Sequence, residues 1–273
     1  MIVSEAKNRI RQHYDIASSY YHSLWGIHIH HGYWKTGTES KEEAQENLIR
    51  LLIDKAQIKN NQRILDVGCG MGGSSIYLTQ HLHADVIGIT LSPIQVAMAK
   101  KFAEQCHVQV DFRVMDAEHM HFNQNFDIVW SVEALSHLNN QKLFFKHAAQ
   151  ILSPQSTLVI TDWFSKENIS ENDRKRFIEP IKRNMLTPHM KTMAEYKQYI
   201  EDAGFKIIVF EDISSHVEKT WDICAKLISN SNTWKIALRH GKDFVNFLKA
   251  FQSMRKGYAS KTFIYGLMVA KKI

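Results

Sequence analysis

Residues 63–73 read RILDVGCGMGG, an apolar run that ends in an acid and a cluster of glycines. The run RILDV predicts a buried strand, and a helical pattern follows the glycines through Leu82. A strand, a glycine turn and a helix together open a nucleotide-binding type of α/β unit. Gly68, Gly70 and Gly73 fit the GxGxxG pattern, which is weakly specific until its context is considered.

Asp66 supplies that context, because it stands at the tip of the first strand beside the turn. In a dinucleotide site the pyrophosphate approaches the helix N-terminus, and the acid that binds the ribose ends the second strand. A carboxylate at residue 66 would repel a pyrophosphate and would suit an ammonium group. We therefore expect S-adenosylmethionine, with its cationic amine and sulfonium, rather than NAD. A structural turn capped by Asp66 is the alternative.

The alternation of strands and helices continues on the C-terminal side of this unit. Further strands are expected over 84–89, 108–114, 126–131 and 157–163, with intervening helices over 93–106 and 140–152. Such an order predicts a parallel sheet with right-handed crossovers. A helix over 192–203, a strand over 205–210 and a strand-like run over 262–270 follow. The fold class is α/β.

Two segments are expected to lie outside the sheet of a single domain. Residues 1–60 form a helical cap, residues 61–212 the α/β core, residues 213–258 a helical lid and residues 259–273 the final strand. The lid region is rich in aromatic residues, and one predicted helix face carries Phe244, Phe247, Phe251 and Met254. Three explanations stay open: core packing, an apolar lid over a hydrophobic acceptor, and docking on a membrane surface by way of flanking basic residues such as Lys242.

Composition excludes several classes of protein. The 273 residues are 44% hydrophobic and 23% charged, as in ordinary globular proteins. The net charge of +6 is spread along the chain, which argues against nucleic acid as a partner. Three dispersed cysteines, an N-terminus without an apolar signal region and the absence of an 18-residue apolar run favour a cytoplasmic protein with no membrane span.

Residues after the second and third strands are candidates for contacts to the rest of the cofactor. No acid ends the second strand, so Thr90 and Gln95 could hydrogen-bond a ribose diol. Ser92 with Pro93 is typical of a helix N-cap followed by Pro at the first helical position. After the third strand, Asp116 could accept a hydrogen bond from the amino group of adenine, or it is a solvated loop acid.

The fourth and fifth strands bring candidate catalytic residues to the carboxyl edge of the sheet, where ligands of such folds bind. Methyl transfer is an in-line displacement that needs a base when the acceptor is a hydroxyl or a carbon acid. His137 is the natural base, and Asp162 could orient it or a substrate hydroxyl. Glu133 could bind a cationic acceptor or stabilise a carbocation, or it is structural.

No carboxylate or cysteine stands at ligand spacing from the histidines at 28, 30 and 31, so no metal is expected.

The segments DVGCGMGGSS (66–75), GITLSPIQ (88–95), MDAEHM (115–120) and FDIVWSVEALSHL (126–138) together resemble the class I S-adenosylmethionine-dependent methyltransferases. The chain is most similar to the group that holds γ-tocopherol methyltransferases, plant N-methyltransferases, rebeccamycin-type sugar O-methyltransferases and sarcosine/dimethylglycine methyltransferases. HHGYW (30–34) resembles that group's N-terminal segment, which covers the cofactor. The resemblance is specific from about residue 10 to residue 165 and then fades.

This resemblance implies a Rossmann-like, mostly parallel seven-stranded sheet with an antiparallel C-terminal strand. It implies that His137 and Asp162 match the proton-transfer pair proposed for the sugar O-methyltransferases. The implied cofactor contacts are Gly68, Gly70 and Gly72 at the methionyl end, Thr90, Leu91 and Gln95 at the ribose, Asp116 and Ala117 at adenine, and Tyr14 and Tyr33 as closing aromatics. The segment 153–156, SPQS, departs from the usual Pro-Gly-Gly at a turn distant from the site.

The expected function is methyl transfer from S-adenosylmethionine to oxygen, nitrogen or carbon of a small, largely apolar, prenylated or aromatic metabolite. A lipid methyltransferase of the cyclopropane-synthase type and a non-catalytic cofactor-binding scaffold are the alternatives. A nucleic-acid methyltransferase is disfavoured, because residues 131–134 read SVEA where amino-directed enzymes carry Pro-Pro and an aromatic residue. The partner is a small-molecule acceptor; peripheral membrane contact and the oligomeric state stay open.

Overall fold

The computed structural model describes residues 5–228, 234, 238 and 241–273, without the side chains of residues 227, 242–244 and 247. Three residues of the predicted lid stripe and its basic flank, Phe244, Phe247 and Lys242, therefore have side chains outside the described part. The described residues form a seven-stranded sheet in the order β3-β2-β1-β4-β5-β7-β6. Its strands are β1 (Arg63–Val67), β2 (Asp85–Thr90), β3 (Asp111–Val114), β4 (Phe126–Val132), β5 (Leu152–Ser165), β6 (Phe205–Asp212) and β7 (Phe263–Lys272).

The pairing confirms the predicted sheet. The first five strands pair in parallel, and β7 runs antiparallel between β5 and β6. Several boundaries differ from the prediction, including the start of β5 at Leu152 rather than 157. Strand β3 begins at Asp111 rather than 108, because this edge strand pairs only with β2, from Asp111 to Val114. Strand β5 continues to Ser165, because its C-terminal half is paired with β7 up to Phe263.

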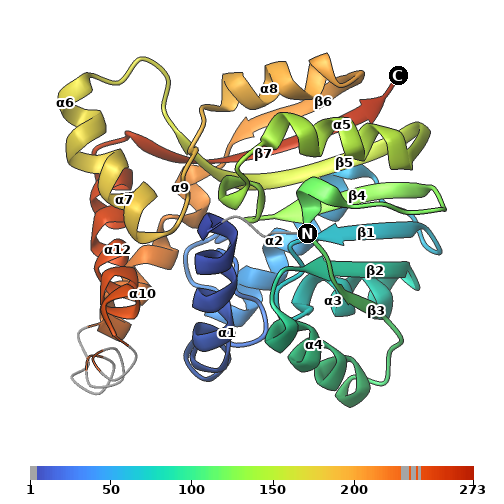
Figure 1. Ribbon diagram of the computed structural model, residues 1–273, viewed down its shortest axis with the longest axis horizontal. Helices are drawn as coiled ribbons and strands as arrows, with labels where there is room; N and C mark the ends of the chain where they lie inside the picture. Colours follow the sequence, from blue (N-terminus) through green and yellow to red (C-terminus); the bar gives the residue numbers. More distant parts are fainter. Residues whose placement is uncertain (1–4, 229–233, 235–237, 239–240) are drawn as a thin grey trace.

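Helices cover both faces of the sheet (Figure 1). Buried residues of α2 (Lys41–Ala56) and α3 (Gly73–Leu82) pack with Ile64 and Ile128 on one face. On the other face, α5 (Gln141–Ile151) and α8 (Met193–Asp202) pack with Leu65 and Val129. Alternate residues of β1 and β4 thus face opposite layers, as both faces of a parallel sheet require. Helix α4 (Pro93–Gln105) packs beside β3 through Phe112.

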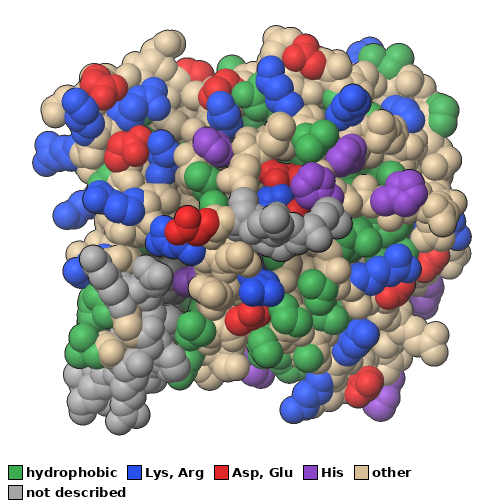
Figure 2. All heavy atoms as spheres, viewed as in Figure 1, with side chains coloured by type: hydrophobic (Ala, Val, Ile, Leu, Met, Phe, Trp, Pro, Cys, Tyr) green, Lys and Arg blue, Asp and Glu red, His purple; other side chains and the backbone are tan. Residues whose placement is uncertain are grey.

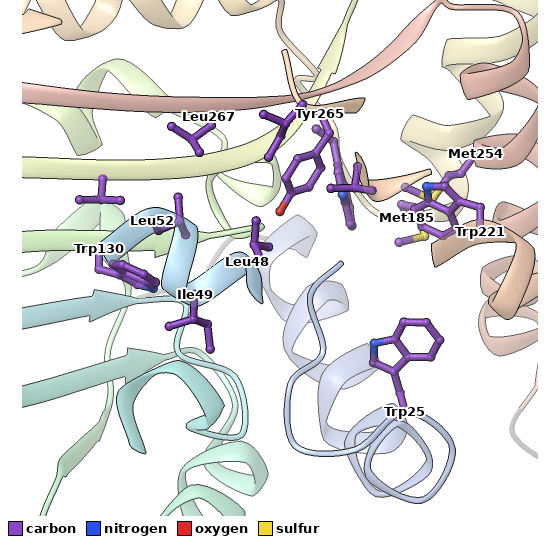
Figure 3. Close-up of a cluster of buried hydrophobic side chains, with 14 of the residues drawn as sticks. Trp25, Leu48, Ile49, Leu52, Trp130, Met185, Trp221, Met254, Tyr265 and Leu267 are labelled. Atoms are coloured by element: carbon purple, nitrogen blue, oxygen red, sulfur yellow. The ribbon is translucent and has the colours of Figure 1, made fainter. Parts of the chain in front are cut away.

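Helices gather beyond the carboxyl ends of the strands. They are α1 (Glu5–Trp25), α6 (Glu171–Asp173), α7 (Glu179–Asn184), α9 (Ser214–Val217), α10 (Lys219–Ile228) and α12 (Lys242–Ala259). The segment 171–184, for which no helix was predicted from the sequence, packs on α12, where a Cβ on Gly257 would meet Ile181 Cδ1 at 3.1 Å. Met185, Trp221 and Met254 meet between α7, α10 and α12 (Figure 3).

Phe251 and Met254 of the predicted stripe are buried, with 8% and 0% exposure. They pack in one cluster with Trp221, so these two side chains belong to the interior and not to a membrane-facing surface. On the face drawn in Figure 2, Lys and Arg side chains lie among Asp and Glu and form no large patch of one sign. Among the described helices, none has the length and apolarity needed to cross a bilayer.

The turn after β1 generates a stability prediction. Gly68 has φ +78°, and a Cβ there would lie 2.2 Å from Ala134 Cβ, whereas Gly204 has φ +88° and a Cβ there would meet no atom within 4 Å. Alanine at either position is destabilised by the positive φ, but only in Gly68→Ala does the new Cβ also overlap another side chain, that of Ala134. We expect Gly68→Ala to lower the free energy of unfolding by at least about 2 kcal/mol more than Gly204→Ala does. Urea denaturation of both variants measures this, and equal losses would contradict the close approach.

Candidate functional site

A pocket lies at the carboxyl ends of β1, β2 and β4, under α1. Since β1 stands between β2 and β4, the strand order reverses at this point, which is where open α/β sheets bind ligands. One part of the lining comes from the turn after β1 and the loops after β2, β3 and β4. The other part comes mainly from α1, from the segment 27–31 that follows it, and from α10 and α12.

The glycine turn presents backbone to this pocket. The backbone N–H groups of Gly68 and Cys69 donate to Ile89 O, which joins the turn to the end of β2. Gly68 and Gly70 line the pocket with positive φ. Gly72, predicted as a methionyl contact, does not line it. A Cβ on Gly72 would meet Phe112 Cζ at 2.7 Å, so this glycine allows α3 to approach the β3 layer instead.

Asp66 is a buried acid at the pocket wall, with 2% exposure. Ser75 Oγ donates a hydrogen bond of 2.6 Å to Asp66 Oδ2. Burial raises the pKa of Asp66 to about 7, against the weaker effect of that hydrogen bond. A cationic group placed beside Asp66 would favour the charged carboxylate. The environment therefore fits the ammonium end of the predicted cofactor.

The predicted ribose residues also lie together. Thr90 Oγ1 donates to Gln95 Oε1 at 2.7 Å, and both residues and Leu91 line the pocket. Ser92 caps α4 by accepting a hydrogen bond from the backbone N–H of Gln95, which confirms the predicted N-cap. Ser92 Oγ in turn donates to Asp15 Oδ1 of α1. The cap thus joins the β2 loop to the helix above it.

Asp116 and Ala117 line the pocket beyond β3. Asp116 Oδ1 accepts a hydrogen bond from the backbone N–H of Glu118 at 3.0 Å, and Oδ2 accepts one from Lys7 Nζ at 2.5 Å. Lys7 also forms an ion pair with Glu118. An adenine amino group at Asp116 would share this carboxylate with Lys7 of α1, which was not predicted.

Tyr14 and His137 meet across the pocket, as the hydroxyl of Tyr14 lies 3.0 Å from His137 Nε2. His137 Nδ1 lies 3.0 Å from Leu186 O. Since a carbonyl only accepts, Nδ1 carries the proton, and Nε2 accepts from Tyr14. Burial lowers the pKa of His137 and raises that of Tyr14, so both groups are neutral near pH 7.

Asp162, predicted to orient His137 or a substrate hydroxyl, is fully buried and does not line the pocket. Its oxygens accept hydrogen bonds from the backbone N–H groups of Ser136 at 2.7 Å and Trp163 at 2.8 Å. The partners of the His137 ring are Tyr14 and Leu186, so Asp162 does not orient this ring directly. Burial raises the pKa of Asp162 to about 7. Asp162 holds the loop that carries His137.

Tyr33 also lies away from the pocket lining. Its ring stacks on His216 with 4.6 Å between the ring centroids, and its backbone N–H donates to Ala44 O. Tyr14 of α1, the other predicted closing aromatic, does line the pocket, together with Ile10, Ala17 and Tyr21, which were not predicted. Their spacing of three to four residues along a helix was the signal that could have identified them.

Glu133 lines the pocket in a left-handed conformation, with φ +54°. Its Oε1 accepts hydrogen bonds from the backbone N–H of His31 at 2.6 Å, from His31 Nδ1 at 2.9 Å and from the hydroxyl of Tyr265 at 2.8 Å. Although burial opposes it, His31 and His30 hold the pKa of Glu133 below its usual range. The sequence pattern singled out His31 only as part of a histidine cluster.

The far end of the pocket is largely apolar. Its lining there includes Trp163, Met185, Trp221, Cys224, Ile228, Leu248 and Phe251. Trp221 and Phe251 come from the predicted lid, whereas Phe263 and Tyr265 belong to β7 and Phe210 is 43% exposed on β6. In the part of the chain that the structure describes, no three His, Cys, Asp or Glu side chains are grouped as metal ligands.

Comparison with known proteins places this architecture. Residues 3–261 match the family described as mycolic acid cyclopropane synthetase. Tocopherol O-methyltransferase of Arabidopsis thaliana is 27% identical over 289 residues, which cover 96% of this chain and 81% of that protein. (+)-O-methylkolavelool synthase of Herpetosiphon aurantiacus is 30% identical over 216 residues, with 77% and 75% covered. The structure of mycolic acid cyclopropane synthase CmaA1 complexed with SAH and CTAB has a TM-score of 0.85 at 18% identity, with 99% of each chain covered.

The environment of Asp66 generates a prediction about cofactor binding. A charge-assisted contact is worth roughly 1.5–3 kcal/mol, so Asp66→Asn should weaken S-adenosylmethionine binding at least about tenfold. Because the pKa of Asp66 is raised to about 7, the carboxyl gains its charge as the pH rises through that value. Wild-type affinity should therefore rise from slightly acidic to slightly basic pH, and Asp66→Asn should lose this rise. Titration calorimetry at both pH values measures it.

The control for this prediction is Asp85→Asn, at the exposed start of β2. It should keep the wild-type affinity and its dependence on pH. A folded Asp66→Asn protein that binds the cofactor as tightly as the wild type would show that Asp66 does not face the ammonium group.

Proposed function

Because the chain belongs to the mycolic acid cyclopropane synthetase family and is an S-adenosylmethionine-dependent methyltransferase, we propose that its acceptor is a small, largely apolar molecule, prenylated or aromatic. One observation carries the proposal: a single pocket extends from the turn at Asp66 to the apolar side chains of α10 and α12. Pockets of this kind bind ligands by apolar burial and orient them with a few polar groups.

We propose that the cofactor occupies the part of the pocket next to the sheet. Asp66 faces its ammonium group, and Gly68 and Gly70 let the backbone approach. Thr90, Leu91 and Gln95 line the ribose, and Asp116 and Ala117 line adenine. The bound cofactor supplies an electrophilic methyl group. The residues fit, since one end of this cradle offers the buried carboxylate of Asp66 to a cationic amine, and the other end offers the half-buried carboxylate of Asp116 to an amino-bearing base.

Tyr14 and His137 close this half of the pocket in the proposal. The base role of His137 stays a prediction. His137 Nε2 could accept a proton from the substrate only after it loses its hydrogen bond from Tyr14. Asp162 supports the loop from below through Ser136. The carboxylate of Glu133 lies toward the apolar half of the pocket, where it accepts hydrogen bonds from His31 and Tyr265.

The relatives support an apolar acceptor, since two of them are named for O-methylation of tocopherol and of kolavelool. A second candidate is methylation of a lipid double bond of the cyclopropane-synthase type, which the family's own description favours. NMR of the product distinguishes the two, because a transferred methyl group and a cyclopropane methylene give different proton signals.

We propose that the protein acts in small-molecule metabolism, in a cytoplasmic and therefore reducing compartment. It is supported by the three cysteines, Cys69, Cys106 and Cys224, which are free thiols. Phe251 and Met254 are buried and therefore do not support peripheral membrane contact.

The acceptor proposal predicts the behaviour of a variant in the apolar half. Trp221 is 3% exposed and lies with its ring centroid 4.8 Å from that of His31 and 5.9 Å from that of Phe251. Trp221→Ala removes this large apolar contact. We expect it to raise the KM for an apolar acceptor at least about tenfold, while the affinity for the cofactor stays within about twofold of the wild type. Release of S-adenosylhomocysteine from pools of apolar and polar acceptors measures this.

Phe210→Ala removes an aromatic side chain that is exposed on β6 and is the matched control, with no expected change in KM. Efficient methylation of polar glycine derivatives by Trp221→Ala, with no turnover of any apolar compound by the wild type, would show that the apolar half does not bind the acceptor.

A further inference from the structure

His31 is a buried pocket residue whose two ring nitrogens have different surroundings. The side chain is 2% exposed and lines the pocket. Its Nδ1 lies 2.9 Å from Glu133 Oε1, and its own backbone N–H donates to the same oxygen. Since an ionised carboxylate only accepts hydrogen bonds, Nδ1 carries the ring proton. The lone pair of the imidazole is therefore on Nε2, away from Glu133.

Nε2 of His31 has no hydrogen-bond partner among the residues that the structure describes. The ring is enclosed by the rings of Trp221 and Tyr265, with 4.8 Å between centroids in each case, and by Trp163 at 6.1 Å. Buried polar groups in proteins are nearly always hydrogen-bonded. A donor is missing here, and a pocket ligand is the group that can bring one.

The carboxylate of Glu133 is held in one place by the fold. Oε1 also accepts from Tyr265 OH at 2.8 Å, and Tyr265 OH lies 2.8 Å from Thr161 Oγ1 of β5. Strands β4, β5 and β7 therefore fix the carboxylate, and the carboxylate fixes the imidazole. This is the arrangement in which a histidine takes a proton while a buried acid orients the ring and stabilises the cation that forms.

Three other pocket histidines lack this combination. His28 has an unpartnered Nδ1 among the described residues, but no carboxylate there bonds its ring. His137 has hydrogen bonds on both nitrogens, from Tyr14 and to Leu186 O. His30 has an unpartnered Nε2 among the described residues, but its Nδ1 donates to a carbonyl oxygen, His31 O, rather than to a carboxylate. Of these four histidines, His31 alone pairs a vacant acceptor nitrogen with a carboxylate in the described part of the chain.

We propose that His31 Nε2 accepts the hydrogen bond, and then the proton, of a hydroxyl group on the acceptor, so that the methyl group is transferred to oxygen. This rests on the proposed function and names its acceptor atom. The acceptor oxygen bonds the methyl carbon as the carbon–sulfur bond breaks, with that electron pair left on sulfur. The hydroxyl proton moves to Nε2, which later releases it to solvent. His31 is the catalytic residue, and Glu133 is a positioning residue that acts through it.

Binding of two matched probes, 4-octylphenol and octylbenzene, tests the hydroxyl contact in protein saturated with S-adenosylhomocysteine. The pair differs only in the hydroxyl group. Wild-type protein should bind the phenol about tenfold more tightly, as one buried hydrogen bond allows. His31→Phe should bind both probes equally, with octylbenzene bound as in the wild type. His147→Phe replaces an imidazole of α5 that lies outside the pocket lining; it is the control and should keep the preference for the phenol.

The outcomes separate the two levels of the proposal. A preference for the phenol that persists in His31→Phe, or is absent from the wild type, overturns the assignment of His31 while the apolar acceptor stands. If wild-type protein binds neither probe, the apolar acceptor itself fails, and the assignment fails with it. Should His31→Phe not fold, as judged by loss of octylbenzene binding, His31→Leu decides by the same comparison.

Turnover tests the proton transfer, with 4-octylphenol as acceptor and S-adenosylhomocysteine release as the signal. His31→Gln should lower kcat by ~10² to 10⁴, because a general base contributes that much. Glu133→Gln should lower kcat at least about tenfold with little change in KM, which a merely structural role would not produce. A His137→Gln protein that loses more turnover than His31→Gln, or a wild type that binds the phenol through its hydroxyl without methylating it, overturns the base assignment.

Discussion

The site depends on the close approach of two loops at the point where the strand order reverses. A Cβ on residue 68 would lie 2.2 Å from Ala134 Cβ, so the turn after β1 and the loop after β4 touch through a glycine. This contact brings Asp66 and Glu133, which end neighbouring strands, to the wall of one pocket. A larger residue would push apart the half that fits a cofactor and the half that fits an acceptor.

Helix α1 closes the site through polar contacts that reach a different loop every few residues. Lys7 bonds Asp116 beyond β3, Asp15 bonds Ser92 beyond β2, and Tyr14 bonds His137 beyond β4. Each partner lies next to, or is itself, a residue proposed to hold the cofactor or the acceptor. Movement of α1 would therefore release three loops together, which couples access to the pocket with its geometry.

Much of the fold could be predicted from local pattern. The apolar runs and the glycine turn identified the strands, and the resemblance implied the antiparallel last strand; both agree with the structure. The helices over 171–184 could not be predicted in this way, because their packing partners, Met254 and Gly257, lie some 70 residues later in α12. Three residues that the family resemblance singled out contact other parts of the fold instead of the pocket. Gly72 lies against Phe112, Tyr33 stacks on His216, and Asp162 bonds the backbone of Ser136.

The sequence by itself determined the class of the protein, because a strand that ends in an acid and a glycine turn opens a series of alternating strands and helices. It also placed Asp66, Thr90, Gln95 and Asp116 at the ends of parallel strands, which meet at one edge of a sheet. Only the tertiary structure decided which pocket histidine combines a vacant nitrogen with a carboxylate on the other nitrogen. His31 and Glu133 are about 100 residues apart along the chain, and no local pattern records that β4, β5 and β7 hold the carboxylate against that ring.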